Sequence, residues 1–251
     1  MRTRTQRRMT RSLVAGVAGL AAVAAIATAQ VASAAETRTI TETIEVTGTF
    51  DGAGDTFVGG GVLGGDGQDE GQDALFELAD GATLVNVTIG SPAADGVHCS
   101  GSCTLSNVNW LDVGEDAATF RGTNATVLID GGSAAHAADK VFQDNRLAGG
   151  SLTIRDFTVS DFGKLYRSCG NCSSQAARTA TISNLTATAP GDVLAGVNAN
   201  LGDTMTISGA TVSDGIEVCN IFNGNDTGDE PTKISSEPDG VHCIASGITT
   251  G

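Results

Sequence analysis

Acidic and basic side chains recur along this chain at intervals that would bring them together in a repetitive fold. The members of one series are separated by 20, 25 and 24 residues: Asp95, Glu115, Lys140 and Lys164. If each separation is one turn of a solenoid, these side chains stack on one face at about 4.8 Å, the distance between neighbouring strands. Asp95, Glu115 and the adjacent Asp116 would offer the carboxylate oxygens that calcium prefers. An amine beside such an ion has its charged form disfavoured, so the series predicts a calcium site next to a general base.

Taken singly, these groups have simpler interpretations. The Glu115–Asp116 pair could be a solvated turn. His98 and His242 lie in two copies of Asp-Gly-Val-His-Cys, where we expect structural residues beside a cysteine rather than metal ligands. The sequence contains no Gly-x-Ser-x-Gly motif, so a serine-hydrolase triad has no support. It is the combination of carboxylates and bases that indicates a catalytic site.

Short segments rich in Thr, Val and Ile would have to position these side chains. Successive copies begin at Thr83, Thr104, Thr126, Leu152, Thr181 and Met205. Within each copy stands a residue that tolerates a left-handed backbone: Asn86, Asn107, Asp130, Asp156, Asn184 or Gly209. Such a residue can bend the chain sharply from one strand into the next. The sequence therefore predicts an all-β fold, a right-handed single-stranded parallel β-helix. A β-sandwich would show hairpin signals at closer spacing.

The N-terminal segment has the order of a secretory signal peptide. Five arginines precede an apolar run at 13–27, and the small residues 32–34 suit cleavage. The apolar run is too short to favour a membrane span. We expect residues 1–34 to be removed, residues 35–251 to form one β-helical domain, and the protein to be secreted to the extracellular space. A mitochondrial presequence would instead spread its Arg and Ser through an amphipathic helix.

Six cysteines in an exported chain indicate disulfides. The natural pairs are Cys99 with Cys103, Cys169 with Cys172, and Cys219 with Cys243, although other connectivities remain open. A zinc site formed by the first four of these cysteines is the alternative, and an extracellular location disfavours it.

The charge balance limits the partners of the chain. Without its first 34 residues it keeps nine basic and 29 acidic residues, which excludes nucleic acid and anionic membrane on electrostatic grounds. A polyanionic substrate would need a divalent cation and a local basic patch. Seven of the nine basic residues fall within 121–178 and would supply that patch: Arg121, Lys140, Arg146, Arg155, Lys164, Arg167 and Arg178.

The motifs around these residues resemble the pectate lyases of polysaccharide lyase family 3. The resemblance extends from about residue 40 to the C-terminus and rests on four motifs in this order: Ala94-Asp95-Gly-Val-His-Cys99, Asp112-Val-Gly-Glu115-Asp116-Ala117, Asp139-Lys140-Val-Phe-Gln143 and Asp161-Phe-Gly-Lys164-Leu-Tyr-Arg167-Ser-Cys-Gly-Asn-Cys172. Members of that family are compact parallel β-helices that bind calcium and act on the unesterified galacturonan of plant cell walls. The resemblance thus implies an enzyme that cleaves polygalacturonate (pectate) by β-elimination to 4,5-unsaturated oligogalacturonates, and for a small secreted lyase we expect a monomer.

The resemblance also implies roles for individual residues. Asp95, Glu115 and Asp116 match the calcium ligands. Lys140 and Arg167 are both open as the base that removes the proton from C5 of the sugar. Three further residues are expected to contact the substrate: Lys164, Asp139 and Glu70.

Two other functions fit a β-helix. A polygalacturonase would hydrolyse the same polymer, but it would need paired carboxylates around a water and no calcium. A non-catalytic β-helical carbohydrate-binding protein would leave the clustered bases without a role.

Overall fold

The structure is a computed structural model that describes Met1, residues 34–68 and residues 71–251. The predicted signal peptide at 1–34 therefore falls almost wholly outside the described residues, and Glu70 falls outside them as well. Among the residues that are described, we find no helix long and apolar enough to cross a bilayer. The unit formed by residues 35–251 is described below.

In the part that the structure describes, this unit is built from β-strands and two short 3-10 helices, η1 (Gly61–Leu63) and η2 (Ala199–Leu201). The strands of its first half are β1 (Thr37–Ile40), β2 (Ile44–Val46), β3 (Thr49–Asp51), β4 (Thr56–Gly59), β5 (Phe76–Leu78), β6 (Ala82–Val85), β7 (Thr88–Ile89), β8 (Val97–Cys99), β9 (Cys103–Trp110) and β10 (Asp116–Phe120). Those of its second half are β11 (Thr126–Asp144), β12 (Ser151–Arg155), β13 (Thr158–Ser168), β14 (Thr179–Asn198), β15 (Thr204–Val212), β16 (Glu217–Asn223), β17 (Thr232–Ser235) and β18 (Cys243–Thr250).

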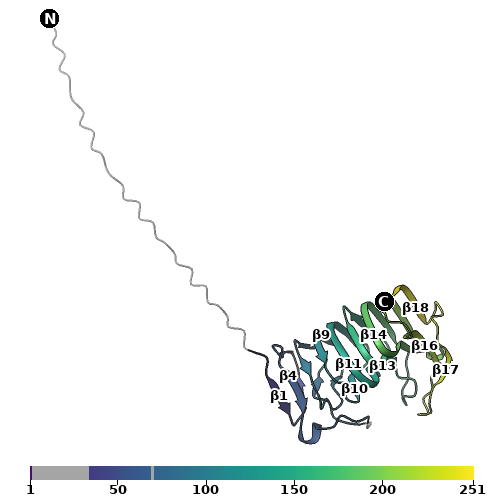
Figure 1. The fold of residues 1–251 in the computed structure, drawn as a ribbon, viewed down its shortest axis with the longest axis horizontal. Helices are drawn as coiled ribbons and strands as arrows, with labels where there is room; N and C mark the ends of the chain where they lie inside the picture. Colours follow the sequence, from purple (N-terminus) through teal and green to yellow (C-terminus); the bar gives the residue numbers. More distant parts are fainter. Residues whose placement is uncertain (2–33, 69–70) are drawn as a thin grey trace. The chain divides into compact units, whose positions relative to one another are not determined.

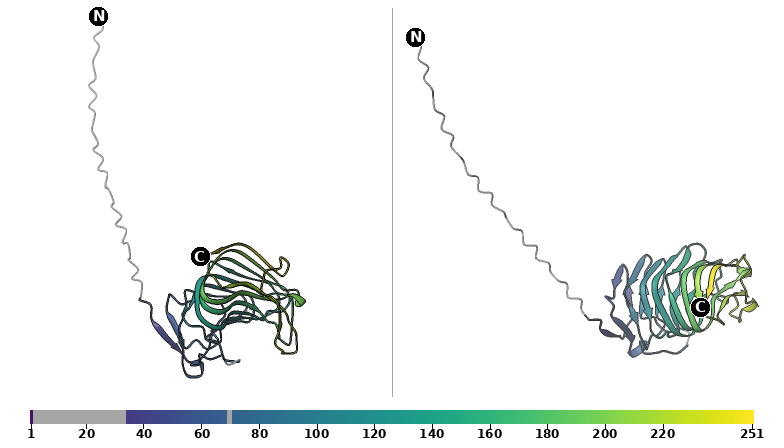
Figure 2. Two further views of the ribbon diagram at one scale, coloured as in Figure 1. Left: turned by 45° about the vertical axis from the view of Figure 1, so that its right-hand side comes forward. Right: turned by 45° about the horizontal axis from the view of Figure 1, so that its top comes forward.

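Each strand pairs in parallel with the strand one coil further along the chain. β9 pairs with β11, β11 with β13, β13 with β14, and β14 with both β15 and β16. β17 departs from this rule, because it folds back antiparallel to β16. The successive coils stack side by side in Figure 1 and in both views of Figure 2. The prediction of an all-β parallel β-helix is confirmed.

Left-handed residues form the bends between strands, as the sequence predicts for most coils. Asn107 and Asn184 have φ of 53° and 50°, and Asn86, Asp156 and Gly209 are also left-handed. The prediction for Asp130 is wrong, because the bend in that coil is made by Gly131, with φ of 72°. Asp130 lies opposite Ser106 within the strand pairing, one position before the bend column.

Aliphatic side chains fill the inside of the coils in register. One column is formed by paired residues that are fully buried: Leu84, Leu105, Ile129, Ile154, Ile182 and Ile207. Burying each such side chain contributes roughly 1.5–3 kcal/mol, so the column both stabilises the coils and fixes their register. A one-residue slip would turn the aliphatic side chains outward.

The cysteines form three disulfides, Cys99–Cys103, Cys169–Cys172 and Cys219–Cys243. These are the pairs predicted from the sequence. The alternative of a zinc site is wrong, because all four of its cysteines are disulfide-bonded.

Candidate active site

Three buried carboxylates converge where two neighbouring coils begin their strands. Asp95 lies just before β8, Glu115 just before β10, and Asp116 is the first residue of β10. All three side chains are buried, and ligand oxygens of the three lie within 4.8 Å of one another. The close approach of the two loops depends on Gly114, since a Cβ there would lie 2.0 Å from the carbonyl oxygen of Ala94.

The donor atoms of this cluster fit a calcium ion. They are hard carboxylate oxygens: Oδ1 of Asp95 is buried without a hydrogen-bond partner among the described residues, and Oδ1 of Asp116 is buried with the amine of Lys140 3.4 Å away. Burial raises the pKa of Asp116 to about 8, opposed by the charge of Lys140 and reinforced by Glu115 and Asp95. A buried carboxylate cluster of this kind is costly unless a cation neutralises it.

His98, which we expected to be only structural, holds one of these carboxylates. Its Nε2 lies 2.6 Å from Asp95 Oδ2, and its Nδ1 lies 3.3 Å from Glu77 Oε2. The ring is buried, so Asp95 is fixed through one oxygen while Oδ1 stays available. The second Asp-Gly-Val-His-Cys copy places His242 beside Asp239, 2.7 Å away, in the C-terminal segment. Sequence spacing alone did not distinguish the two copies.

Lys140 lies directly beside the carboxylates. Its Nζ is 3.4 Å from Asp116 Oδ1, 3.5 Å from Glu115 Oε1 and 2.8 Å from Asp139 Oδ2. The strand pairing places Asp116, not Glu115, opposite Lys140. The expected ladder is therefore shifted by one residue at this coil. Burial lowers the pKa of Lys140, but the charges of Asp116, Asp139 and Glu115 outweigh it and raise the pKa overall.

Asp139 connects the two lysines of the site. Lys164 lies opposite Lys140 in the next coil, and its amine also donates to Asp139. Burial raises the pKa of Asp139, but the hydrogen bonds from Lys140 and Lys164 outweigh it, so the pKa is lowered. Asp139 thus remains charged and holds both amines on the same side of the coil.

Arg167 lies one coil beyond Gln143, on the same strand as Lys164. Its Nη1 donates to Asn198 Oδ1 at 3.1 Å and to the carbonyl oxygen of Ser168, and its guanidinium carbon lies 4.2 Å from the centre of the Phe222 ring. Burial lowers the pKa of Arg167 to about 10. The guanidinium therefore stays charged near neutral pH and is held in a fixed orientation.

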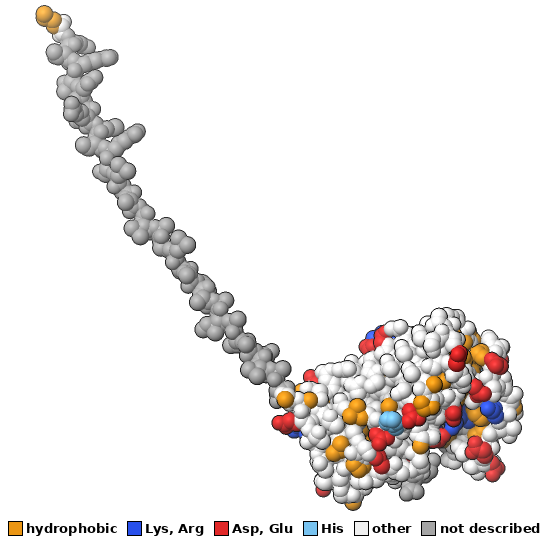
Figure 3. Space-filling view, viewed as in Figure 1, with side chains coloured by type: hydrophobic (Ala, Val, Ile, Leu, Met, Phe, Trp, Pro, Cys, Tyr) orange, Lys and Arg blue, Asp and Glu red, His pale blue; other side chains and the backbone are white. Residues whose placement is uncertain are grey.

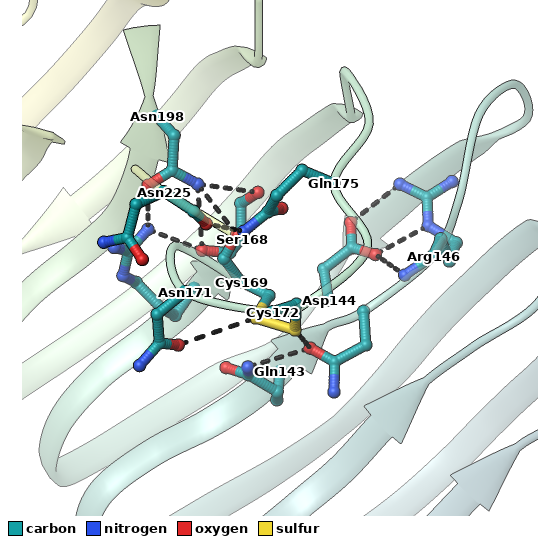
Figure 4. The surroundings of a disulfide bond; sticks show 12 residues. Gln143, Asp144, Arg146, Ser168, Cys169, Asn171, Cys172, Gln175, Asn198 and Asn225 are labelled. Atoms are coloured by element: carbon teal, nitrogen blue, oxygen red, sulfur yellow. Dashed lines mark hydrogen bonds and ion pairs between the residues drawn. A yellow bond between two sulfur atoms is a disulfide. The ribbon is translucent and has the colours of Figure 1, made fainter. Parts of the chain in front are cut away.

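A buried polar network beneath Arg167 keeps it there. Asn198 donates through Nδ2 to the carbonyl oxygens of Ser168 and Cys169, next to the Cys169–Cys172 disulfide (Figure 4). Asp203 accepts hydrogen bonds from both Asn198 and Ser168. The disulfide loop and the following coil thus form one rigid support.

Two connected depressions contain these residues. Lys140, Lys164 and Arg167 line one of about 200 Å³, together with Asp139 and Glu230. A smaller one is lined by the three carboxylates and Arg121, and it shares Lys140 and Gln143 with the first. Acidic side chains surround a few basic ones on the face shown in Figure 3. Carboxylates, amines and a guanidinium from successive coils therefore meet in one cleft.

Comparison with known proteins identifies the family. The family model described as pectate lyase matches residues 28–229. The chain is 50% identical over 195 residues to a probable pectate lyase E of Neosartorya fischeri, covering 77% of this chain and 75% of the relative. It is 50% identical over 197 residues to pectate lyase E of Emericella nidulans, with coverage of 77% and 75%.

Solved structures agree with this. The catalytic domain of pectate lyase PelI from Erwinia chrysanthemi superposes with a TM-score of 0.73 at 33% identity, covering 86% of this chain and all of that domain. PelI in complex with tetragalacturonic acid superposes with a TM-score of 0.70 at 33% identity, covering 85% of this chain and 70% of PelI. Because the family model matches most of the chain, half of the aligned residues are shared with curated pectate lyases, and the fold is shared with solved ones, the chain belongs to the pectate lyase family of enzymes.

Proposed function

We propose that this enzyme cleaves unesterified (1→4)-linked galacturonan by calcium-dependent β-elimination. The observation that carries the proposal is the cleft in which Asp95, Glu115 and Asp116 lie beside Lys140 and Arg167. The tetragalacturonic acid bound to the related PelI supports the choice of polymer. The elimination would transfer the C5 proton to the base, form a double bond between C4 and C5, and break the C4–O bond, so that the glycosidic oxygen leaves with the neighbouring unit and is protonated to a hydroxyl.

Asp95, Glu115 and Asp116 are the residues that would hold the calcium ion. Calcium bound there would supply Lewis-acid polarisation of the uronate carboxylate, which would acidify the proton on the adjacent C5. The polymer is anionic, and the carboxylate cluster would repel it in a protein whose formal net charge is already −15. Neutralising the cluster removes that repulsion.

Lys140 is the base in this proposal. Its amine lies nearest the carboxylate cluster and can take the C5 proton when it is neutral. The charges of Asp116, Asp139 and Glu115 raise the pKa of Lys140. The neutral amine therefore requires that two of these carboxylates, Glu115 and Asp116, bind calcium instead. Activity should therefore depend on alkaline pH as well as on the metal.

Arg167 and Lys164 would stabilise negative charge on the substrate. Arg167 is fixed by Asn198 and by the ring of Phe222, and a fixed guanidinium suits the binding of a carboxylate or of enolate-like negative charge. Lys164 would contact a neighbouring uronate carboxylate. Asp139 would keep both lysines oriented. Glu70 stays a proposed substrate contact on the resemblance alone.

The remaining proposals concern location and assembly. The basic, apolar and small-residue order of 1–34 supports export through a cleaved signal peptide, with 35–251 as the mature extracellular domain. The three disulfides support an oxidising compartment. We propose a monomer that acts on pectate, with neither nucleic acid nor membrane as a partner.

The test is the ultraviolet absorbance of the unsaturated product formed from polygalacturonate. We expect absorbance that needs calcium and is lost with a chelator, and a fall in kcat of roughly 10²–10⁴-fold in Lys140→Ala. Arg155→Ala, which removes an exposed cation paired with Asp130, is the control and should turn over normally. New reducing ends without absorbance would indicate a hydrolase, and binding without cleavage a carbohydrate-binding protein. Near-normal turnover in Lys140→Ala would leave Arg167 as the base.

A further inference from the structure

A second depression adjoins the cleft at Lys164. It has a volume of about 310 Å³, and its polar lining consists of two lysines, two carboxylates and an amide: Lys164, Lys233, Asp192, Glu217 and Asn220. Lys164 belongs to both depressions, so the two are contiguous. Nothing in the proposed chemistry uses Lys233, Glu217 or Asn220.

The segment 230–233, which leads into the antiparallel strand β17, contributes side chains to both depressions. Glu230 and Pro231, just before β17, line the catalytic depression, and Lys233 of β17 lines the second. Lys233 lies opposite Phe222, the residue whose ring stacks on Arg167. The segment that departs from the regular coils therefore brings a cation to the end of the cleft, beyond β16 in Figure 1.

The second depression lies along the coils from the reacting groups. Lys164 pairs with Val193, and Val193 pairs with Glu217, so Glu217 is two coils further on. At the spacing of neighbouring strands this is a displacement of about 10 Å. A polymer bound across Lys140 and Lys164 in this direction must pass over Glu217 and Lys233.

The polar groups of this depression are incompletely satisfied within the protein. Lys233 Nζ is 3.8 Å from Glu217 Oε2, and both side chains are nearly half exposed. Such a long, exposed pair contributes little to stability and can exchange for a ligand carboxylate. Asn220 is 7% exposed, and its Oδ1 has no hydrogen-bond partner in the part of the chain that the structure describes. Asn220 also lines the depression, and its amide oxygen can accept a hydrogen bond from a sugar hydroxyl.

We infer that Lys233 and Asn220 form an additional subsite, which binds the carboxylate and a hydroxyl of a galacturonate unit remote from the bond that is cleaved. This inference rests on the proposed function, because the polymer that occupies the cleft is the substrate. The carboxylate of each galacturonate unit is the group that Lys233 would bind, in place of Glu217. Lys233 is a specificity-determining residue in this assignment and takes no part in the proton transfer.

The experiment compares Lys233→Gln with wild type on a series of oligogalacturonates of increasing length and on polygalacturonate. We expect equal KM for the shortest cleaved substrate and a KM raised roughly threefold to tenfold for the polymer, at unchanged kcat. Arg155→Gln is the matched control, since Arg155 has 48% side-chain exposure against 47% for Lys233 and lines neither depression. An effect that is independent of chain length, or equally present in Arg155→Gln, would overturn the inference.

Binding provides a readout that needs no turnover. A long oligogalacturonate is titrated calorimetrically into Lys140→Ala and into the double variant that also carries Lys233→Gln. The double variant should bind more weakly, by about the same several-fold factor as the rise in KM. Equal affinities would remove Lys233 from the subsite. A wild-type enzyme that forms no unsaturated product would contradict the β-elimination, while this titration would still decide whether Lys233 binds the polymer.

Discussion

Calcium binding should release a proton from Asp116 at neutral and acidic pH. Burial and the neighbouring carboxylates raise its pKa from 3.8 to about 8, so the metal-free carboxyl is largely protonated below that value. A calcium ligand has to be ionised, and the ion therefore displaces the proton. We expect the apparent affinity to fall about tenfold for each pH unit below 8, to roughly a hundredth at pH ~6.

The same shift should appear in the stability of the calcium-free protein. In the unfolded chain Asp116 titrates near its ordinary value, while in the folded protein it keeps its proton up to about pH 8. Between these two values the folded state binds more protons. The stability that Asp116 contributes is therefore fully present below about pH 4 and falls by at most ~1.4 kcal/mol per pH unit until pH ~8, an upper bound of ~5–6 kcal/mol in total. Saturating calcium should restore it.

Calorimetry in two buffers of different ionisation enthalpy measures the released proton directly. Urea unfolding with a chelator, at pH values across this range, measures the stability. Asp116→Asn is the control for both, because it is similar in shape but cannot ionise. It should bind calcium weakly, show a shallower loss of stability with pH, and be more stable than wild type at alkaline pH without calcium.

A calcium affinity that does not change between mildly acidic and alkaline pH would refute this reasoning. So would a calcium-free stability profile that is the same in wild type and Asp116→Asn. Either result would mean that Asp116 is already ionised in the metal-free protein, and that the polar surroundings of the cluster are better solvated than its burial indicates.

Two further predictions concern positioning and backbone. His98→Ala should weaken calcium binding roughly 10–100-fold in calorimetry, because Asp95 loses its fixed orientation, and His98→Gln should recover part of the loss. His242→Ala is the matched control, and equal affinity in all of these variants would remove His98 from this role. Asn107→Ala should lower the free energy of unfolding by ~1–2 kcal/mol, since φ is 53° there, and Asn107→Gly should lower it less. Identical denaturant midpoints for the three proteins would contradict a left-handed requirement at this bend.

Much of the fold could be predicted because its signals are local. A left-handed residue between two β-branched segments bends the chain wherever it occurs, and the same unit recurs in each coil. The error at Asp130 has a physical reason: Asp and Gly both tolerate this conformation, and only the pairing with Ser106 and Val108 selects Gly131. The disulfide pairs were also predictable, since two of the three join cysteines within five residues.

The candidate site was less completely visible. Spacing placed Asp95, Glu115 and Lys140 about one coil apart, but strand pairing puts Asp116 opposite Lys140. The contact of His98 with Asp95 could not be recognised, because the same motif recurs around His242 in a different setting. Whether the finer assignment to polysaccharide lyase family 3 holds stays a prediction, as do the roles of the individual residues.

The sequence by itself determined the coil, its bends and the order of chemical groups along it, because these depend on residue types a few positions apart. Only the tertiary structure decided which oxygens are buried together, which amine lies among them, and that Lys233 of β17 lines a depression next to the cleft. Burial and charge coupling are the reason. Both depend on side chains that strand pairing and loop length bring together, so neither can be read from the identity of a single residue.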